Sequence, residues 1–438
     1  MLFQNYERAI VFLTAVMLLG LSLIACSVSP SATVGSDDTP TSSAESEDSR
    51  GTPQDVGEPT LSELVEGNNA FAFDLFQAVR NKNSNLFYSP YSISVALAMT
   101  YTGARTSTEE QMANVLHYTL PQDQLHPTFN YLEYLLTNQE IDEIRQEEDF
   151  ILHVANSIWG QDGYSFLPEY LDLIARNYGA ELRVLDFGDE NNREQARLAI
   201  NDWISEQTEG KIDDLIRKGM LTEMTRLVLA NAVYFKAEWE DPFLNATRDD
   251  EFYLLDGSAV TVPMMSRRGF ANYFESTGYQ AIEIPYRGER FQMVILLPAE
   301  GRFDDIESSL DNEFVNSLLR GFASDDIKLY LPKFEYEASL SLANTLAEMG
   351  MPDAFDKLQA DFSGIAKIPP NLFITHIEHK AFVAVDETGT EAAAATGVVA
   401  VAVSEPVVVE VNRPFIFFIR DSESGTIVFV GRVINPTS

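Results

Sequence analysis

The sequence is poor in cysteine and in positive charge, and each shortage excludes a class of protein. Its only cysteine in 438 residues is Cys26, so no internal disulfide can form. The 30 basic residues are outnumbered by 67 acidic ones, which gives a formal net charge of −37. Nucleic acids and anionic lipid surfaces are bound through Lys and Arg, so this balance argues against both as partners. Apolar material is abundant: 45% of the residues are hydrophobic, enough for a large buried core.

The common catalytic motifs are missing as well. The chain has no P-loop, no dinucleotide-binding glycine pattern, no Gly-x-Ser-x-Gly and no His-Glu-x-x-His. His376 and His379 are three residues apart, but they lie in an apolar stretch typical of a strand, where that spacing directs side chains to opposite faces. We therefore expect neither an enzyme nor a bound metal or cofactor.

The N-terminal segment, residues 1–25, is typical of a signal peptide. Its apolar run Ala9–Ala25 is short for a membrane-spanning helix. The run ends in Leu23-Ile24-Ala25-Cys26, which resembles the cleavage box of bacterial lipoproteins, where the cysteine becomes the lipidated first residue. The alternative is a transmembrane anchor with an incidental cysteine. We expect export across the cytoplasmic membrane and a lipid anchor on Cys26 at the cell envelope, with the domain facing outward or into a periplasm.

Composition divides the rest of the chain in two. Residues 26–60 are rich in Ser, Thr, Pro, Asp and Glu, and such a segment cannot bury enough apolar area to offset its ordering entropy. We expect a disordered acidic tether there. No second linker or repeat interrupts residues 61–438, which we interpret as one domain.

Periodicity within that domain predicts helices first and antiparallel strands later, hence an α+β fold. Ser89-Pro90 before an apolar run is a helix start. Two apolar runs at the C-terminus are joined by a polar turn, which predicts a hairpin. The expected helices are Leu61–Arg80, Ser92–Gly103, Leu167–Tyr178 and Asn192–Gln207, and the expected strands are Arg226–Phe235, Phe291–Leu297, Ile327–Leu331, Phe415–Arg420 and Thr426–Val433.

One segment near the C-terminus has an unusual composition. From Ala392 to Ser404 it contains no charge, no aromatic residue and no proline. Every even position from Thr390 to Ala402 is small or β-branched, which suits a tightly packed strand. Its flanks are polar and rich in turn residues. Composition alone leaves open whether this segment is a permanent core strand or an exposed loop.

Motifs from about Leu61 to the end resemble, in order, those of the serpin family of protease inhibitors. That many motifs in series make the resemblance specific. It implies the serpin fold: a helix-rich N-terminal half, a large central mixed sheet, further sheets and an exposed reactive-centre loop at about residues 387–411. The matching motifs are Asn85–Ile93 with Ala96–Met99, Asn201–Ile204, Thr208–Ile212, Asn231–Lys236, Leu331–Phe334, His379–Ala381, Asn412–Phe415 and Asn435-Pro436.

The resemblance also implies a mechanism. Serpins are suicide substrates: a serine protease attacks the loop and forms a covalent acyl-enzyme, and the cut loop then inserts into the main sheet. The family's spacing, sixteen residues after the hinge Glu387, gives Val403–Ser404 as the reactive bond, with Ala402–Val403 as the alternative one residue earlier. A small aliphatic residue there suits a shallow apolar pocket, hence an elastase-like or subtilisin-like target.

Further roles follow from the family pattern. The expected hinge comprises Glu387, Gly389, Thr390, Glu391, Ala392, Ala393, Ala394 and Ala395, with Gly389 as its flexible start and Thr390 as its first inward-facing residue. The residues expected beneath the sheet or where insertion begins are Ser89, Ser92, Asn231, Trp239, Lys333 and His379, with Lys333 and Glu387 forming an ion pair.

The partners expected from the sequence are few. Residues 121–149, where some serpins bind sulfated polysaccharides, are strongly acidic here, so we expect no glycosaminoglycan cofactor. We expect a monomer whose partners are the target protease and, through its lipid, the membrane. The alternative is a non-inhibitory serpin that acts as a chaperone or binding protein.

Overall fold

A computed structural model describes residues 50–80, 84–137, 150–367, 372–390 and 405–437. The predicted lipidation site Cys26 lies outside these residues. The folded chain begins earlier than expected, because Arg50 donates hydrogen bonds to Asn130 and Glu133, at 2.7 Å each. The first helix, α1 (Glu58–Val79), likewise begins before Leu61. The C-terminal end of the expected tether therefore packs as part of the domain.

Helices dominate the first half and strands the second, so the predicted α+β class is confirmed. Each helix and strand predicted from periodicity is present, with bounds shifted by a few residues. The helices after α1 are α2 (Pro90–Tyr101), α3 (Thr106–Leu116), α4 (Gln122–Thr137), α5 (Pro168–Tyr178), α6 (Glu190–Gln207), α7 (Phe303–Ser308), α8 (Asn312–Gly321), α9 (Ala343–Met349) and the 3₁₀ helix η2 (Pro352–Phe355). The strands are β1 (Leu86–Tyr88), β2 (Phe150–Gln161), β3 (Leu182–Leu185), β4 (Leu227–Glu238), β5 (Arg248–Tyr253), β6 (Ala259–Glu275), β7 (Tyr279–Pro285), β8 (Phe291–Pro298), β9 (Ala323–Pro332), β10 (Phe334–Ser341), β11 (Ile374–Val385), β12 (Gly389–Thr390), β13 (Val407–Glu410), β14 (Phe415–Asp421) and β15 (Ile427–Val433).

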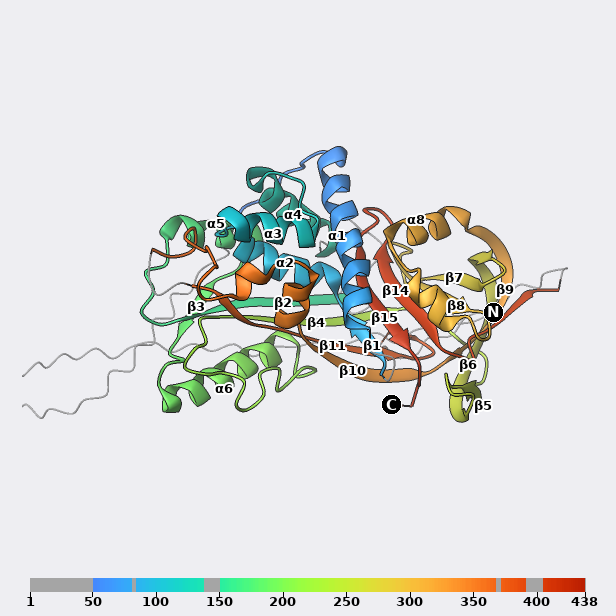
Figure 1. The fold of residues 1–438 in the computed structure, drawn as a ribbon. Coiled ribbons are helices and arrows are strands. Elements are labelled where there is room, and N and C mark those ends of the chain that lie inside the picture. The colour runs from blue at the N-terminus through green and yellow to red at the C-terminus, as the bar shows by residue number, and fades with distance from the viewer. Residues whose placement is uncertain (1–49, 81–83, 138–149, 368–371, 391–404, 438) are drawn as a thin grey trace, which may run out of the picture. The chain divides into compact units, whose positions relative to one another are not determined.

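The strands form two sheets. A six-stranded sheet has the order β10-β11-β12-β4-β2-β3, and β11 also pairs directly with β4 in parallel. A nine-stranded sheet contains β1, β5 to β9 and β13 to β15, including the predicted C-terminal hairpin β14–β15. Helices α2 to α5 cover one face of the six-stranded sheet, and α6 covers the opposite face (Figure 1).

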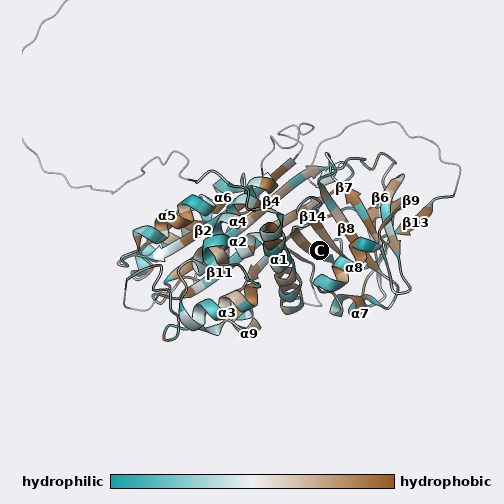
Figure 2. Cartoon of the chain, turned by 90° about the horizontal axis from the view of Figure 1, so that it is seen from above, coloured by the Kyte–Doolittle hydropathy of each residue, from teal (hydrophilic) through white to brown (hydrophobic). Residues whose placement is uncertain are grey.

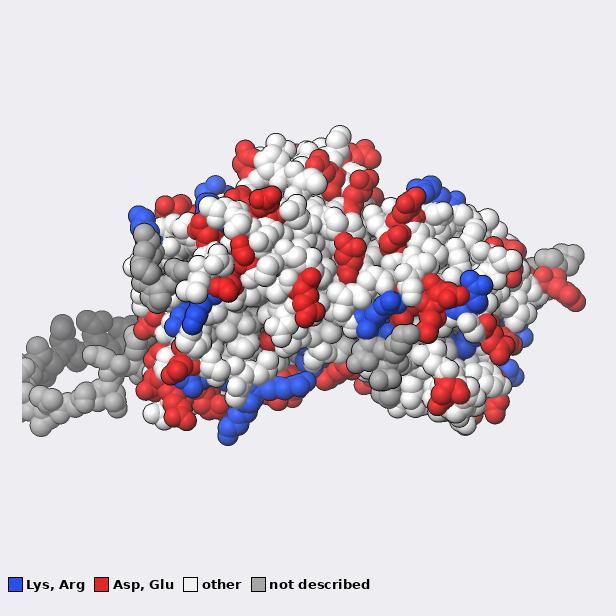
Figure 3. All heavy atoms as spheres, viewed as in Figure 1, with Lys and Arg blue, Asp and Glu red and all other residues white. Residues whose placement is uncertain are grey.

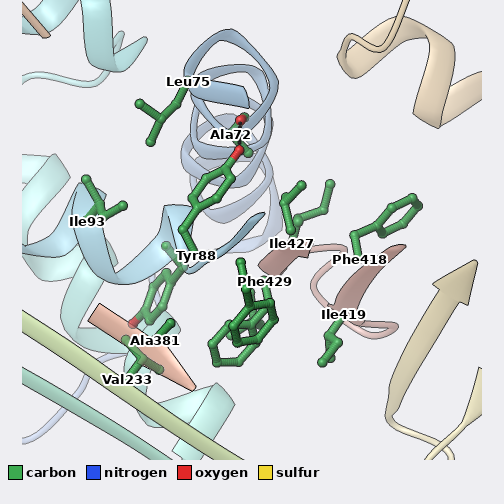
Figure 4. Close-up of a cluster of buried hydrophobic side chains, with 14 of the residues drawn as sticks. Ala72, Leu75, Tyr88, Ile93, Val233, Ala381, Phe418, Ile419, Ile427 and Phe429 are labelled. Carbon is green, nitrogen blue, oxygen red and sulfur yellow. Dashed lines mark hydrogen bonds between the residues drawn. The ribbon is translucent and has the colours of Figure 1, made fainter. Parts of the chain in front are cut away.

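Helix α2 lies in the interior of the folded domain. Ser89 caps its N-terminus by accepting a hydrogen bond from the Ser92 backbone, and Pro90 fills the first helical position. All twelve residues of the helix are buried, which explains its nearly continuous apolar sequence. Figure 4 shows the core beside it, where Tyr88 donates a hydrogen bond to the Ala72 carbonyl at 2.7 Å, with Val233 of β4 and Ala381 of β11 nearby. These two strands therefore present their core face to α2.

The distribution of apolar and acidic residues in the structure agrees with the composition of the chain. Many strand segments are coloured hydrophobic in Figure 2, while the helices mix hydrophilic and hydrophobic stretches. Acidic side chains are scattered over the face seen in Figure 3 and outnumber basic ones there.

Candidate functional site

The predicted hinge enters the six-stranded sheet between β4 and β11. These two strands pair directly in parallel as far as Phe382 and Tyr234. Beyond that row, β12 lies between them and runs antiparallel to both: Thr390 pairs with Val385 on one side and with Ala237 on the other. We call the boundary between β4 and β11 the seam. The seam is closed along most of its length and already split at one end by two residues of the hinge.

Gly389 is needed at this position because the backbone of β4 is so close. A Cβ atom on Gly389 would lie 2.1 Å from the Ala237 carbonyl oxygen and 2.7 Å from Glu238 Cα. Distances below about 3.0 Å essentially never occur for real Cβ atoms. The sequence suggested a flexible start to the hinge; in the structure Gly389 is instead a buried, paired residue that permits close contact.

Thr390 faces the interior, as expected for the first inward residue of the hinge. It is 1% exposed, so the expectation of an exposed loop from about residue 387 onward is wrong at this residue. Its hydroxyl shares a hydrogen bond of 2.8 Å with that of Tyr286. Trp239 stacks on the Tyr286 ring, with ring centroids 4.5 Å apart. The indole N–H of Trp239 donates to the Asp386 carbonyl at 3.0 Å, so Trp239 holds the turn that leads into the hinge.

Lys333 and Glu387 form the predicted ion pair at this end of the sheet, with 2.7 Å between Nζ and Oε2. Thr247 also donates a hydrogen bond to the Glu387 carboxylate. Burial acts to raise the pKa of Glu387, but the hydrogen bonds from Lys333 and Thr247 outweigh it and lower the pKa overall. Both side chains of the pair are about one third exposed, at 36% and 30%, so the pair adds at most about 1 kcal/mol.

A buried polar cluster lies further along the seam, on its core face. The Ser89 backbone N–H donates to His379 Nε2 at 3.2 Å, and the other ring nitrogen of His379 bonds to the Asn231 side-chain oxygen. The Asn231 amide in turn donates to the Ser92 hydroxyl and to Asn156. The structure thus brings Ser89, Ser92, Asn231 and His379 together. Asn231 and His379 are directly paired across the seam, so their hydrogen bond joins its two sides.

Burial fixes the charge state of this cluster. Desolvation lowers the pKa of His379 to about 3, so the imidazole is neutral at physiological pH. A neutral ring has one donor and one acceptor nitrogen, which suits its two different partners. The cluster is therefore uncharged and can be separated without exposing a buried ion.

Three residues of these contacts were missed by sequence reasoning. Asn156 in β2 joins the polar cluster, Tyr286 after β7 meets Thr390, and Thr247 bonds Glu387. An Asn within a largely apolar strand was a detectable signal for Asn156. Tyr286 and Thr247 lie in polar connecting segments whose sequence carries no such signal.

The remaining loop residues lie outside the described part of the chain. They are the hinge residues Glu391, Ala392, Ala393, Ala394 and Ala395 and the predicted reactive bond Val403–Ser404. Before this gap Thr390 lies in the six-stranded sheet, and after it Val407 begins β13, which pairs in parallel with β9 of the nine-stranded sheet. The two ends of the loop are thus held by different sheets.

The described residues offer neither a metal-binding cluster nor a membrane-spanning helix. They contain no group of three or more His, Cys, Asp or Glu side chains able to hold a metal ion. Nor does any helix within these ranges have the length and apolarity needed to cross a membrane.

Comparison with known proteins agrees with this geometry. The family profile described as serpin (serine protease inhibitor) matches residues 66–436. An uncharacterised serpin-like protein of Thermococcus kodakarensis is 41% identical over 379 residues, covering 85% of this chain and 86% of that one. The leukocyte elastase inhibitor of Homo sapiens is 38% identical over 390 residues, covering 86% of this chain and all of that protein.

A solved structure supports the same assignment at the level of the fold. The crystal structure of human thyroxine-binding globulin with its hormone has a TM-score of 0.78 and 28% identity, and covers 86% of this chain and 100% of that one. The profile match, the relatives and the shared fold all indicate one family. This chain belongs to the serpin family.

Proposed function

We propose that this chain is a suicide-substrate inhibitor of elastase-like or subtilisin-like serine proteases, which traps its target by loop insertion. The observation that carries the proposal is the position of Gly389 and Thr390. They already form a two-residue strand between β4 and β11, in which both residues pair with β4 and Thr390 pairs with β11 as well. Only a strand entering from this end would continue that pairing.

The register of the seam supports continued insertion. Phe382 faces Tyr234 directly, and three residues further along both strands Val385 and Ala237 flank Thr390. The two strands thus keep one relative register whether they touch or are separated. A strand continued from Thr390 in this register would bring Thr396 between Asn231 and His379. A threonine hydroxyl there could replace the hydrogen bond that separation breaks, which avoids the cost of about 1–3 kcal/mol for an unsatisfied buried group.

The specificity proposal depends on Val403. A valine in the residue before the reactive bond suits a shallow apolar pocket, whereas a trypsin-like pocket requires Arg or Lys. The relative from Homo sapiens is named as an inhibitor of leukocyte elastase, which agrees with this class.

The second candidate is a non-inhibitory binding protein. One structure of the same fold is that of a globulin named for binding thyroxine, so the fold also carries ligand-binding functions. The run of small residues after Thr390 favours inhibition, because a narrow gap in a sheet admits small side chains without steric cost.

We also propose that Cys26 carries a lipid that anchors the chain at the cell envelope. The support is the Leu23-Ile24-Ala25-Cys26 sequence before a polar segment. The acidic surface in Figure 3 would not bind an anionic membrane by charge, so the lipid would supply the attachment.

The experiment is to incubate the full chain with neutrophil-type elastase, with subtilisin and with trypsin, and to analyse the products on denaturing gels. We expect complexes that survive SDS with the first two proteases only, and a higher unfolding midpoint for chain nicked in the loop than for intact chain. Cleavage without a trapped complex, together with equal midpoints, would reject inhibition and favour the binding protein.

A further inference from the structure

The segment that follows α6, residues 208–226, lies over the seam on the face opposite α2. Its apolar side chains, including Ile212, Ile216 and Leu221, share a hydrophobic cluster with Val228 and Ala230 of β4. Toward β11 it makes polar contacts: the Asp213 carbonyl accepts a hydrogen bond of 2.9 Å from Lys380. We call residues 208–226 the strap, because they contact both strands that insertion must separate.

One strap residue touches both sides of the seam in a single row. The ammonium of Lys211 lies 5.7 Å from the centroid of the Tyr234 ring in β4 and 5.9 Å from that of the Phe382 ring in β11. Tyr234 and Phe382 are partners in the parallel pairing. They also form the last directly paired row before β12 begins to separate the strands. Lys211 therefore lies at the leading edge of the closed seam.

The backbone around Lys211 holds it in this position. The Lys211 N–H donates to the Thr208 carbonyl at 2.9 Å, and the Ile212 N–H donates to the Thr208 hydroxyl at 3.2 Å. Glu209 and Gly210 adopt left-handed conformations, with φ of 53° and 74°, and the buried side chain of Ile212 fixes the far side of the turn. A tight, anchored turn thus directs the ammonium over the two rings.

Insertion must break this arrangement. A new strand between β4 and β11 would widen their separation by about 4.8 Å, the spacing of neighbouring strands. Both rings already lie close to the limit of about 6 Å for a cation–π contact. The new strand would also occupy the space between the rings, so the ammonium could keep at most one of them.

We propose that Lys211 is a positioning residue that holds the seam closed at its leading row and so limits the rate at which a strand enters. This inference rests on the proposed insertion mechanism. The proposal predicts the sign of the effect: removing the cation should make insertion faster. Loss of a merely structural contact would instead lower the unfolding midpoint without favouring strand entry.

The test measures entry of a strand directly. The full chain is mixed with a fluorescein-labelled synthetic peptide of residues 390–403, and incorporation is followed by fluorescence anisotropy. For Lys211→Met, which keeps the length but loses the charge, we expect incorporation about two- to fivefold faster than in wild type, from the usual strength of one cation–π contact. Lys211→Arg keeps a cation and should restore the wild-type rate.

Two further variants make the result specific. Lys218→Met removes the same charge from an exposed position in the same strap and should leave the rate unchanged. Phe382→Leu removes one ring but keeps an apolar side chain, and it should accelerate incorporation even if Lys211→Met does not fold.

The outcomes separate the two proposals. If the peptide enters wild type, and Lys211→Met and Phe382→Leu take it up at the wild-type rate, the role of Lys211 is refuted while insertion stands. If no peptide enters wild type and nicking the loop leaves the unfolding midpoint unchanged, the insertion mechanism itself is refuted.

Discussion

The close approach of Gly389 to β4 makes the substitution Gly389→Ala a sharp test of the split seam. The added Cβ would meet the Ala237 carbonyl oxygen at 2.1 Å and Glu238 Cα at 2.7 Å. Both are backbone atoms of a central strand, so the hinge rather than β4 must move, by about 1 Å. A shift of that size breaks the pairing of Gly389 and Thr390 with β4.

The free-energy cost of this shift follows from the hydrogen bonds that it breaks. Each broken ladder hydrogen bond costs about 0.5–1.5 kcal/mol. Withdrawal of Thr390 also removes the 2.8 Å hydrogen bond to the Tyr286 hydroxyl, and leaving that buried hydroxyl unpaired costs about 1–3 kcal/mol. One ladder bond and the unpaired hydroxyl together cost about 1.5–4.5 kcal/mol. The same clash would persist in the inserted strand, so the substitution opposes insertion from its first step.

The assay measures which fraction of the inhibitor ends in the trapped complex and which is cleaved and released, at a fixed ratio of inhibitor to elastase. If about 1–3 kcal/mol of this cost raises the barrier to insertion, insertion slows by about five- to 150-fold, while acylation at the distant reactive bond does not slow. We expect Gly389→Ala to be cut at the wild-type rate and mostly released.

Gly269→Ala in β6 is the matched control. Its nearest neighbour would be an Asp241 carboxylate oxygen at 3.9 Å, so the methyl group is accommodated and trapping should equal that of wild type. Unchanged trapping by Gly389→Ala would refute the argument that the hinge lies between β4 and β11 in the inhibitory form.

Three other substitutions test separate parts of the account. Val403→Arg should shift the trapped target from elastase toward trypsin, because the trypsin pocket carboxylate gains a partner; in wild type the released C-terminal peptide should begin at Ser404, and a start outside residues 403–405 would contradict the assigned bond. Burial raises the pKa of Glu378 in β11 to about 7, with the hydrogen bond from Ser341 and the charge of Arg217 acting in the opposite direction. The folded state therefore holds this proton more tightly than the unfolded one, and the cost of the buried charge is full above pH 7 and vanishes as the pH falls to about 4.5. Glu378→Gln should stabilise the chain by up to about 3 kcal/mol at pH 8 and by nothing near pH 4.5 in urea unfolding; a gain independent of pH, or an equal one from the exposed Glu335→Gln, would count against this. His379 and His126 have the opposite sign, since burial lowers the pKa of each, so only the difference between variant and wild type isolates Glu378. Cys26→Ala should abolish incorporation of labelled palmitate and release the chain from membranes; a variant that keeps both would reject the lipid anchor.

Local patterns in the sequence determined the elements of this fold. Ser89-Pro90 predicted the start of α2 because a cap and a proline act within one turn of a helix. Alternating and continuous apolar runs predicted β4, β8 and the β14–β15 hairpin, since side-chain periodicity is a property of neighbouring residues. The ordered series of motifs indicated the family. The positions of Val403 and Ser404 remain predictions from the sequence alone.

The tertiary structure decided how distant segments meet. The sequence identified Thr390 as inward-facing but offered no means of finding Tyr286, which lies more than a hundred residues away and shares its hydrogen bond. It suggested a flexible Gly389, whereas the approach of β4 makes this glycine a packing requirement. Neither the split seam nor Lys211 above it could be predicted, because strand register and burial depend on contacts between residues far apart in the chain. Local periodicity specifies which face of a strand is buried, but only the assembled sheet determines which strand lies beside it.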